Sequence, residues 1–454
     1  MQSLRPIEDL VHAFRDAFTA PTFSNFSTLL SAWIMTPLKR TVTGLIRCPF
    51  TGHGVSNNEK HFSVFHRFFS RARWELDDLG RVLMTFFEKS LSDRVTLIVD
   101  DTLCRRSGPR ILGAGMFVDP LTSSTSNGPA RRKTFVFGLN YVVLSLWISA
   151  PLCHSGGIAV PLLFRLYRSK RTCPEHLYHK RTAHALELLR IAIPWFQGRK
   201  VEVLGDAEYA CRTLLDGLPP EVEMIGPLPA KAQLHTPEIR RFRSGRPRLW
   251  GARLPRPREL AEDGGVPWRR VRVEMYGSLV TVLVKEMAAV WKSAGHGRVI
   301  KVIVTRDPAG RLRDGYFFST QGAMSAEELL VIYARRWELE VCFRNVKQEL
   351  GLEEVANGFT RRKKRGRKRS GPQADRRRFP LASVRTAPFA FVAYGVIVAW
   401  YLRHGNANAD LSKARRVMPW YRHKQSISFA DMRLNLSANP ATVRLCENPT
   451  RRAP

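Results

Sequence analysis

A long segment without charged residues limits how this chain can fold. Residues 134–164 contain no Asp, Glu, Lys or Arg, although the 454-residue chain has a formal net charge of +34. Pro151 and the pair Gly156-Gly157 interrupt the segment, and its two halves are rich in Val, Phe, Tyr and Leu. A membrane helix needs ~20 continuous apolar residues, so two buried strands joined by a turn explain the segment better. We therefore expect a sheet with a buried centre.

The positive charge is spread along the chain and indicates a polyanionic partner. There are 73 Lys and Arg residues against 39 Asp and Glu, with a basic run at 361–378 and an arginine-rich block at 240–272. Because 44% of the residues are hydrophobic, a wholly disordered basic protein is excluded. Such a charge is typical of proteins that bind nucleic acid, an anionic membrane or an acidic protein. Taken alone, the run at 361–378 fits a solvated loop equally well.

The remaining composition favours an intracellular protein that does not insert into a membrane. The seven cysteines include no Cys-x-x-Cys pair and no cluster with His at zinc-ligand spacing. This usage is typical of a reducing compartment, so we expect a cytoplasmic location. The N-terminus contains acidic residues and does not resemble a signal peptide. Residues 386–402 are uncharged but short for a membrane span, and we expect a buried helix there.

Two predicted strands end in aspartate. The run 95–101 (VTLIVDD) ends in Asp100 and Asp101, and the run 201–206 (VEVLGD) ends in Asp206. If these strands are neighbours, their carboxylates meet at one edge of the sheet, where Glu340 of a later helix could join them. Three carboxylates are hard oxygen ligands of the kind that hold Mg²⁺. An Asp at a strand end is, however, more often a turn former or a helix cap.

The helix predicted over 325–350 presents Glu340 among cations. Ser325 and Glu328 form a capping-box pattern at its start. At about 100° per residue, a phenol and three basic side chains lie within about 40° of Glu340; they are Tyr333, Arg336, Arg344 and Lys347. A solvated face with ordinary helical ion pairs would have the same pattern.

The spacing on this helix matches that of a known family. Four residues fit the pattern Tyr-x2-Arg-x3-Glu-x6-Lys, namely Tyr333, Arg336, Glu340 and Lys347. On this signature the chain resembles the insertion sequence four group of DDE transposases. The sequences VDDT around Asp101 and GDAEYA around Asp206 are similar to the two aspartate motifs of that group. The resemblance covers roughly residues 95–352. Since strand residues alternate between faces, only one of the adjacent Asp100 and Asp101 is expected to be a ligand, and we choose Asp101 because Thr102 follows it.

The resemblance implies an α/β fold, with an RNase H-like mixed sheet of five strands, a β-rich insertion and an N-terminal helical region. It divides the chain into a helical, DNA-binding region (1–92), the first part of the catalytic core (93–230), the insertion (231–322), the second part of the core (323–405, with a basic loop at 357–380) and a basic C-terminal tail (406–454).

The resemblance also implies an activity. Asp101, Asp206 and Glu340 would be the catalytic residues and would bind two Mg²⁺ ions, which Mn²⁺ could replace. Tyr333, Arg336, Arg344 and Lys347 would contact DNA. The reaction would be strand cleavage and strand transfer at transposon ends, by a cut-and-paste route through a hairpin intermediate. The partners would be double-stranded DNA, at transposon ends and target, and a second copy of the chain; a bacterial, nucleoid-associated location would follow.

Two other functions remain open at this point. A basic nucleic-acid-binding protein without catalysis would have the same charge, but it would not need three intact carboxylates. An RNase H-like nuclease that cleaves DNA without joining strands would need the same acids, and the sequence does not separate it from a transposase.

Overall fold

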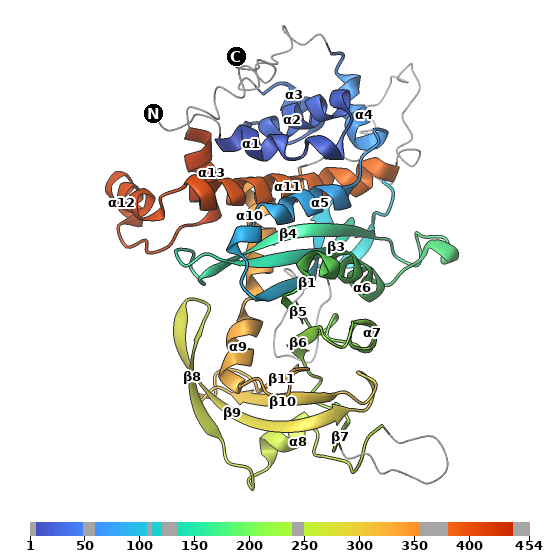
Figure 1. The fold of residues 1–454 in the computed structure, drawn as a ribbon, viewed down its shortest axis with the longest axis vertical. Helices are drawn as coiled ribbons and strands as arrows, with labels where there is room; N and C mark the ends of the chain where they lie inside the picture. The colour runs from blue at the N-terminus through green and yellow to red at the C-terminus, as the bar shows by residue number, and fades with distance from the viewer. Residues whose placement is uncertain are drawn as a thin grey trace.

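The computed structural model describes residues 6–48, 60–106, 111–119, 134–237, 249–354 and 380–438. The basic run at 361–378, the start of the 240–272 block and the end of the predicted C-terminal tail lie outside the described residues. Figure 1 shows a helical layer above a sheet, with a second β-rich part below it.

Five strands form the centre of the molecule. They are β1 (Arg94–Arg105), β3 (Phe135–Ser149), β4 (Gly157–Tyr167), β5 (Lys200–Gly205) and β6 (Glu223–Pro227). Their spatial order is β4-β3-β1-β5-β6, with β1, β5 and β6 parallel and β3 antiparallel to both of its neighbours. This is an RNase H-like mixed sheet, so the predicted fold class is confirmed. The charge-free segment forms β3, β4 and the turn between them.

The β-rich insertion extends this sheet and does not form a separate one. Strand β11 pairs with β6, and the order continues through β10 and β9. Both β7 and β8 pair with β9, and β2 pairs with β3 at the opposite end. The bounds of these elements are β2 (Gly115–Val118), β7 (Leu234–His235), α8 (Pro257–Glu262), β8 (Arg269–Met275), β9 (Ser278–Trp291), β10 (Val299–Arg306) and β11 (Gly315–Ser319).

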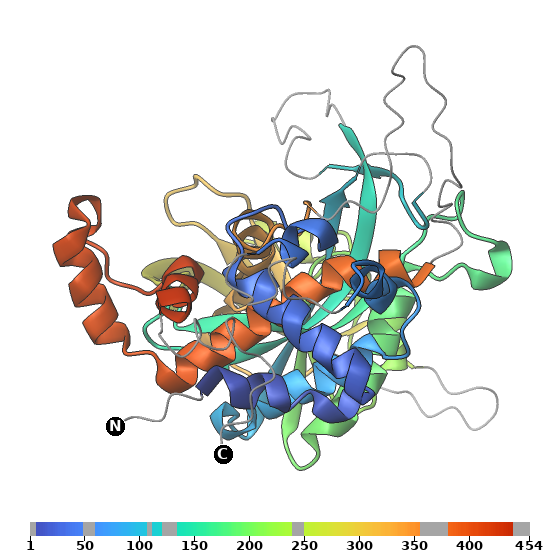
Figure 2. The same ribbon diagram turned by 90° about the horizontal axis from the view of Figure 1, so that it is seen from above.

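Helices cover both faces of the central sheet. On one face, α5, α10 and α11 pack against β4, and the N-terminal helices α1, α2 and α4 pack on α11, as the view from above also shows (Figure 2). On the other face, α6 packs against β3 and β4. The helices are α1 (Pro6–His12), α2 (Ala20–Met35), α3 (Val42–Ile46), α4 (Ser63–Ser70), α5 (Leu76–Thr85), α6 (Arg181–Ala192), α7 (Arg212–Gly217), α9 (Ala326–Ala334), α10 (Trp337–Glu349), α11 (Pro380–His404), α12 (Ala407–Val417) and α13 (Phe429–Ala438).

Helix α11 contains the second uncharged stretch and is a core helix. By length and composition alone, Leu381–His404 could cross a membrane, but 83% of its most apolar window is buried inside the protein. Its buried side chains include Phe389, Phe391 and Tyr394, which pack against other aromatic rings. The expectation of a buried helix over 386–402 is therefore confirmed.

The sequence pattern also predicts helices over 175–196 and 207–215, and both are shorter in the structure. The helix expected over 175–196 is α-helical only from Arg181 to Ala192, and a 3-10 turn containing Pro194 follows it. The helix expected over 207–215 begins only at Arg212, because Asp206 Oδ1 accepts the backbone N–H groups of Glu208 and Tyr209 at 2.8 and 3.2 Å. A side chain that takes these donors favours a turn over a helix.

Candidate functional site

The register of β1 and β5 brings two aspartates together. The parallel pairing runs from Arg94 with Lys200 to Val99 with Gly205, so Asp100 and Asp206 are the next residues on their strands. Asp206 follows the end of β5, as predicted, but β1 continues past its aspartates to Arg105. The prediction that both aspartates of VTLIVDD end a strand is therefore wrong, since β3 pairs with β1 through this stretch and keeps it extended.

Asp100 faces the helix that carries Glu340. The guanidinium of Arg336 reaches Asp100 Oδ2 at 3.2 Å and Glu340 Oε1 at 2.7 Å, so one cation joins the two acids. The pKa of Asp100 is raised to about 8, mainly by burial and also by the negative charges of Asp206 and Asp101, against the opposing effect of Arg336. Asp100, Asp206 and Glu340 therefore border one region, where negative charges lie close together.

Asp101 faces the opposite side of the sheet. Its carboxylate accepts hydrogen bonds from Asn140 Nδ2 at 2.5 Å and from the Tyr209 hydroxyl at 3.0 Å, and Arg181 lies 3.5 Å away. Helix α6, which provides Arg181, covers this face. The sequence-based choice of Asp101 as ligand rested on Thr102, whereas the geometry places Asp100 on the side of Glu340.

The predicted helix over 325–350 is broken in the middle, which corrects the single-helix expectation. Helix α9 ends at Ala334 and α10 begins at Trp337. Across the junction, the N–H groups of Glu338 and Leu339 bond to the carbonyls three residues before them, at 3.1 Å each. At the start of α9, Ser325 accepts the N–H of Glu328, but the Glu328 carboxylate pairs with Arg94 at 2.6 Å.

The predicted DNA-contacting residues occupy different positions around this junction. Arg336 is bound to both acids, and its guanidinium lies 5.9 Å from the centre of the Tyr333 ring. Lys347 acts electrostatically on Cys104 of β1, so it lies on the sheet side of α10. Arg344 is exposed on α10. Of the four residues, Arg336 is the one that forms ion pairs with the carboxylates that the structure brings together.

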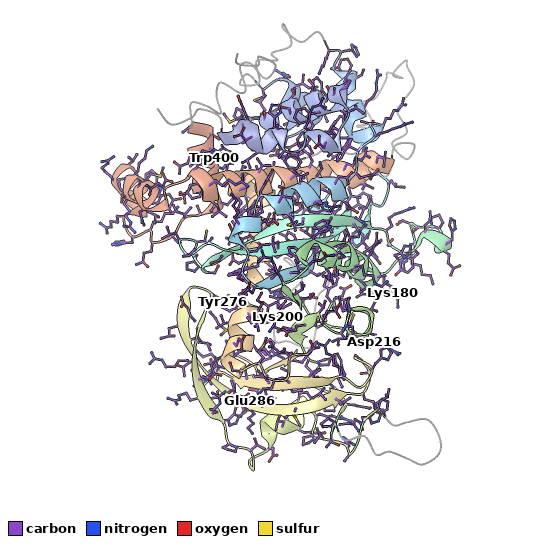
Figure 3. All side chains as sticks on the ribbon, viewed as in Figure 1. Lys180, Lys200, Asp216, Tyr276, Glu286 and Trp400 are labelled. Carbon is purple, nitrogen blue, oxygen red and sulfur yellow. The ribbon has the colours of Figure 1, made fainter. Side chains whose placement is uncertain are left out.

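The insertion contributes a residue that the sequence reasoning missed. Tyr276 lies at the tip of the β8–β9 hairpin with a φ of 55°, and its ring makes an edge contact with Trp337 at 6.4 Å. Burial raises the pKa of Tyr276, the charge of Arg336 lowers it and that of Glu340 raises it, so Tyr276 lies near these two residues. Figure 3 shows Tyr276 at the hairpin tip. The next residue, Gly277, has a φ of 72°, and a Cβ there would collide with the carbonyl oxygen of His154. The sequence signal is the pair Tyr-Gly between two strands, which is typical of a hairpin turn.

The carboxylates of Asp100, Asp206 and Glu340 are suitable ligands for a divalent cation, although they do not form a preformed metal site. Among the residues that the structure describes, no group of three or more His, Cys, Asp or Glu side chains lies close enough to hold a metal ion. Burial and the negative charges of Asp206 and Asp101 raise the pKa of Asp100, and a bound cation would favour its ionised form. The residues therefore fit a metal that draws Asp100, Asp206 and Glu340 together.

An RNase H-like sheet with acids from β1, the end of β5 and a later helix defines a nuclease-type enzyme of the DDE class. A family model described as DDE superfamily endonuclease matches residues 13–277, which is more than half of the chain, and the chain belongs to this family. A second model, described as archaeal putative transposase ISC1217, matches residues 288–367. No curated protein matches the chain. Enzymes of these families act on DNA, and DDE nucleases generally use divalent metals.

Proposed function

We propose that the protein is a DNA transposase that cleaves transposon ends and transfers the freed strand to target DNA. The observation that carries this proposal is the shared position of Asp100 and Asp206 in the β1–β5 register, with Glu340 joined to Asp100 through Arg336. The two family matches support it, since one describes an endonuclease and the other a transposase.

Asp100, Asp206 and Glu340 would hold two Mg²⁺ ions, for which Mn²⁺ could substitute. Bound cations of this kind activate a hydroxyl for attack and compensate the charge of the leaving oxygen. We assign the first ligand to Asp100 and not to Asp101, because Asp100 has the register position of Asp206 and contacts Arg336. Asp101 would then have a structural role, because its carboxylate accepts hydrogen bonds from Asn140 and Tyr209 on the face of the sheet that α6 covers.

Basic and phenolic groups near the carboxylates would orient the DNA backbone. Arg336, held between two acids, is the cation nearest to the position of the scissile phosphate, and Tyr333 supports its guanidinium. Arg344 and Lys347 extend the positive surface along α10. Contacts of this kind position the substrate but carry no sequence information. We further propose that the protein belongs to the insertion sequence four group and that cleavage proceeds through a DNA hairpin intermediate. Two copies of the chain would hold the two transposon ends together.

A nuclease that cleaves without joining strands is the second candidate. The description of the larger family match as an endonuclease favours it. The two functions differ in the fate of the 3′-hydroxyl, since a transposase attacks a second DNA molecule with it and a simple nuclease does not.

The test is a cleavage and joining assay with DNA that carries the inverted repeats flanking the coding sequence. Wild type and the variants Asp206→Asn and Glu340→Gln are incubated with labelled DNA, a target plasmid and Mg²⁺. We expect nicked ends and joined products from the wild type, and neither from the variants, which should still shift the DNA in a gel. Full activity of Glu340→Gln would refute the site, and cleavage without joined products would favour the nuclease.

A further inference from the structure

A second row of polar residues lies on the same face of the sheet as Asp100 and Asp206. In the β1–β5 register, Thr96 is opposite Glu202, four positions before Asp100 and Asp206. Because side chains alternate along a strand, positions four apart share a face. Glu202 is completely buried, with 0% of its surface exposed, and its Oε1 accepts the Thr96 hydroxyl at 2.5 Å. A buried carboxylate on a central strand requires a partner of opposite charge.

Two arginines supply this charge: Arg94 of β1 lies 3.6 Å from Glu202 Oε2, and Arg335 comes from the junction between α9 and α10. Arg335 Nη1 donates to the Thr96 hydroxyl at 2.7 Å and to Glu202 Oε1 at 3.2 Å. The same guanidinium lies 4.1 Å above the ring of Trp147, on the neighbouring strand β3. Arg335 is therefore held by a hydroxyl, a carboxylate and an aromatic face at once.

Consecutive arginines thus bind two rows of the same sheet face. Arg335 contacts Thr96 and Glu202, and Arg336 contacts Asp100 and Glu340. Along a strand, four residues span about 13 Å. The two side chains must diverge to reach both rows. The backbone between α9 and α10 keeps helical dihedral angles at these two residues but is tightened there by hydrogen bonds to carbonyls three residues back.

We propose that Thr96, Glu202 and Arg335 form a positioning site, which sets the α9–α10 junction so that Arg336 and Glu340 reach Asp100 and Asp206. This inference rests on the proposed function, because it assigns these residues a part in phosphodiester cleavage. None of the three contacts the reacting atoms. They act through Arg336 and through the first turn of α10, which carries Glu340.

The alternative is that the buried row only stabilises the fold. A positioning role and a purely stabilising role both predict a lower unfolding temperature when Thr96, Glu202 or Arg335 is replaced. They differ in what happens to folded protein, because a misplacement of about 1 Å at an active site can lower the rate by about 100-fold. A purely stabilising row would leave the rate constant of the folded fraction unchanged.

Thr96→Val and Thr96→Ser make a matched pair. Val has the shape of Thr without the hydroxyl, whereas Ser keeps the hydroxyl that bonds Glu202 and Arg335. Single-turnover cleavage is measured at saturating DNA, well below the unfolding temperature, with DNA affinity measured separately without metal. We expect Thr96→Val to cleave at least about 10-fold more slowly with the dissociation constant unchanged, and Thr96→Ser to cleave at the wild-type rate.

A double-mutant cycle tests whether the row acts as one unit. Glu202→Gln and Arg335→Gln are measured singly and together. Residues of one network give non-additive effects, so we expect the double variant to be no slower than the slower single variant. Glu262→Gln is the control, because it removes an exposed ion pair with Arg258 on α8, away from this row, and should leave the rate unchanged.

The outcomes separate this inference from the proposed function. If wild type cleaves and folded Thr96→Val cleaves at the same rate, the positioning role is wrong while the transposase proposal stands. Additive losses in the cycle would also overturn it. If wild type does not cleave the DNA at all, the proposed function itself fails.

Discussion

Replacing Asp100 with Asn should change how the stability of the protein depends on pH. The Asp100 carboxyl group is buried beside Asp206 and Asp101, and these surroundings raise its pKa from the ordinary 3.8 to about 8. Between these two pH values the folded protein holds a proton on Asp100 and the unfolded chain does not. The free energy of unfolding therefore falls as pH rises through this window, because the folded state binds more protons.

The size of the effect follows from the width of the window. At about 1.4 kcal/mol for each pH unit, the window from 3.8 to about 8 corresponds to about 6 kcal/mol as an upper limit. The stability contribution is complete below about pH 4 and is lost by about pH 8. Asp100→Asn carries no such group, so it should gain stability relative to the wild type as pH rises.

The assay is denaturant unfolding in EDTA at several pH values from 5 to 8.5. We expect Asp100→Asn to exceed the wild type by at least about 2 kcal/mol at pH 8.5 and by much less at pH 5. Asp206→Asn should make the loss of stability smaller and end it at a lower pH than in the wild type, because it removes a negative charge that raises the pKa of Asp100. Adding Mg²⁺ should restore the wild type at pH 8.5 and leave Asp100→Asn little changed. Parallel pH profiles for wild type and Asp100→Asn would refute the reasoning.

Three further predictions concern other parts of the molecule. Gly277→Ala should slow cleavage without unfolding the protein, because the new Cβ would collide with the His154 carbonyl and displace the hairpin tip; equal rates in a cleavage assay would contradict this. Arg385→Met should lower the free energy of unfolding by about 2–4 kcal/mol in denaturant titration, because the buried guanidinium donates to the carbonyls of Ala72 and Trp74, and a stability change near zero would count against it. DNA affinity in a gel shift should fall by ~10³-fold or more between ~50 and ~200 mM salt, and a flat dependence would contradict the electrostatic account.

Much of the fold could be predicted because its strands are strongly patterned. The charge-free segment predicted two strands joined by a turn, which are β3 and β4, and the apolar runs before the aspartates predicted β1 and β5. Helix ends were less predictable, because local bonds that a sequence pattern does not show decide them. Helix α7 begins later than its pattern predicts, because the Asp206 side chain accepts the backbone N–H groups of Glu208 and Tyr209 in the preceding turn.

The site was predictable in its residue types and less so in its orientation. Asp206, Glu340 and Arg336 were expected together, and the last two are in contact. The choice between Asp100 and Asp101 depends on the register of β1 with β5, which is a property of two strands and cannot be read from one. The interruption between α9 and α10 lies at Arg335, whose partner Glu202 is a buried acid 133 residues away in sequence, so the sequence pattern of the helix does not show this contact.

The most direct test compares the cleavage rates of Asp100→Asn and Asp101→Asn on the same transposon-end DNA with Mg²⁺. If Asp100, Asp206 and Glu340 form the active site, Asp100→Asn should lose cleavage while it still binds DNA. Asp101→Asn should keep a rate within about 10-fold of the wild type, since its side chain accepts bonds from Asn140 and Tyr209 on the other face. Loss of cleavage by Asp101→Asn together with an active Asp100→Asn would contradict this account.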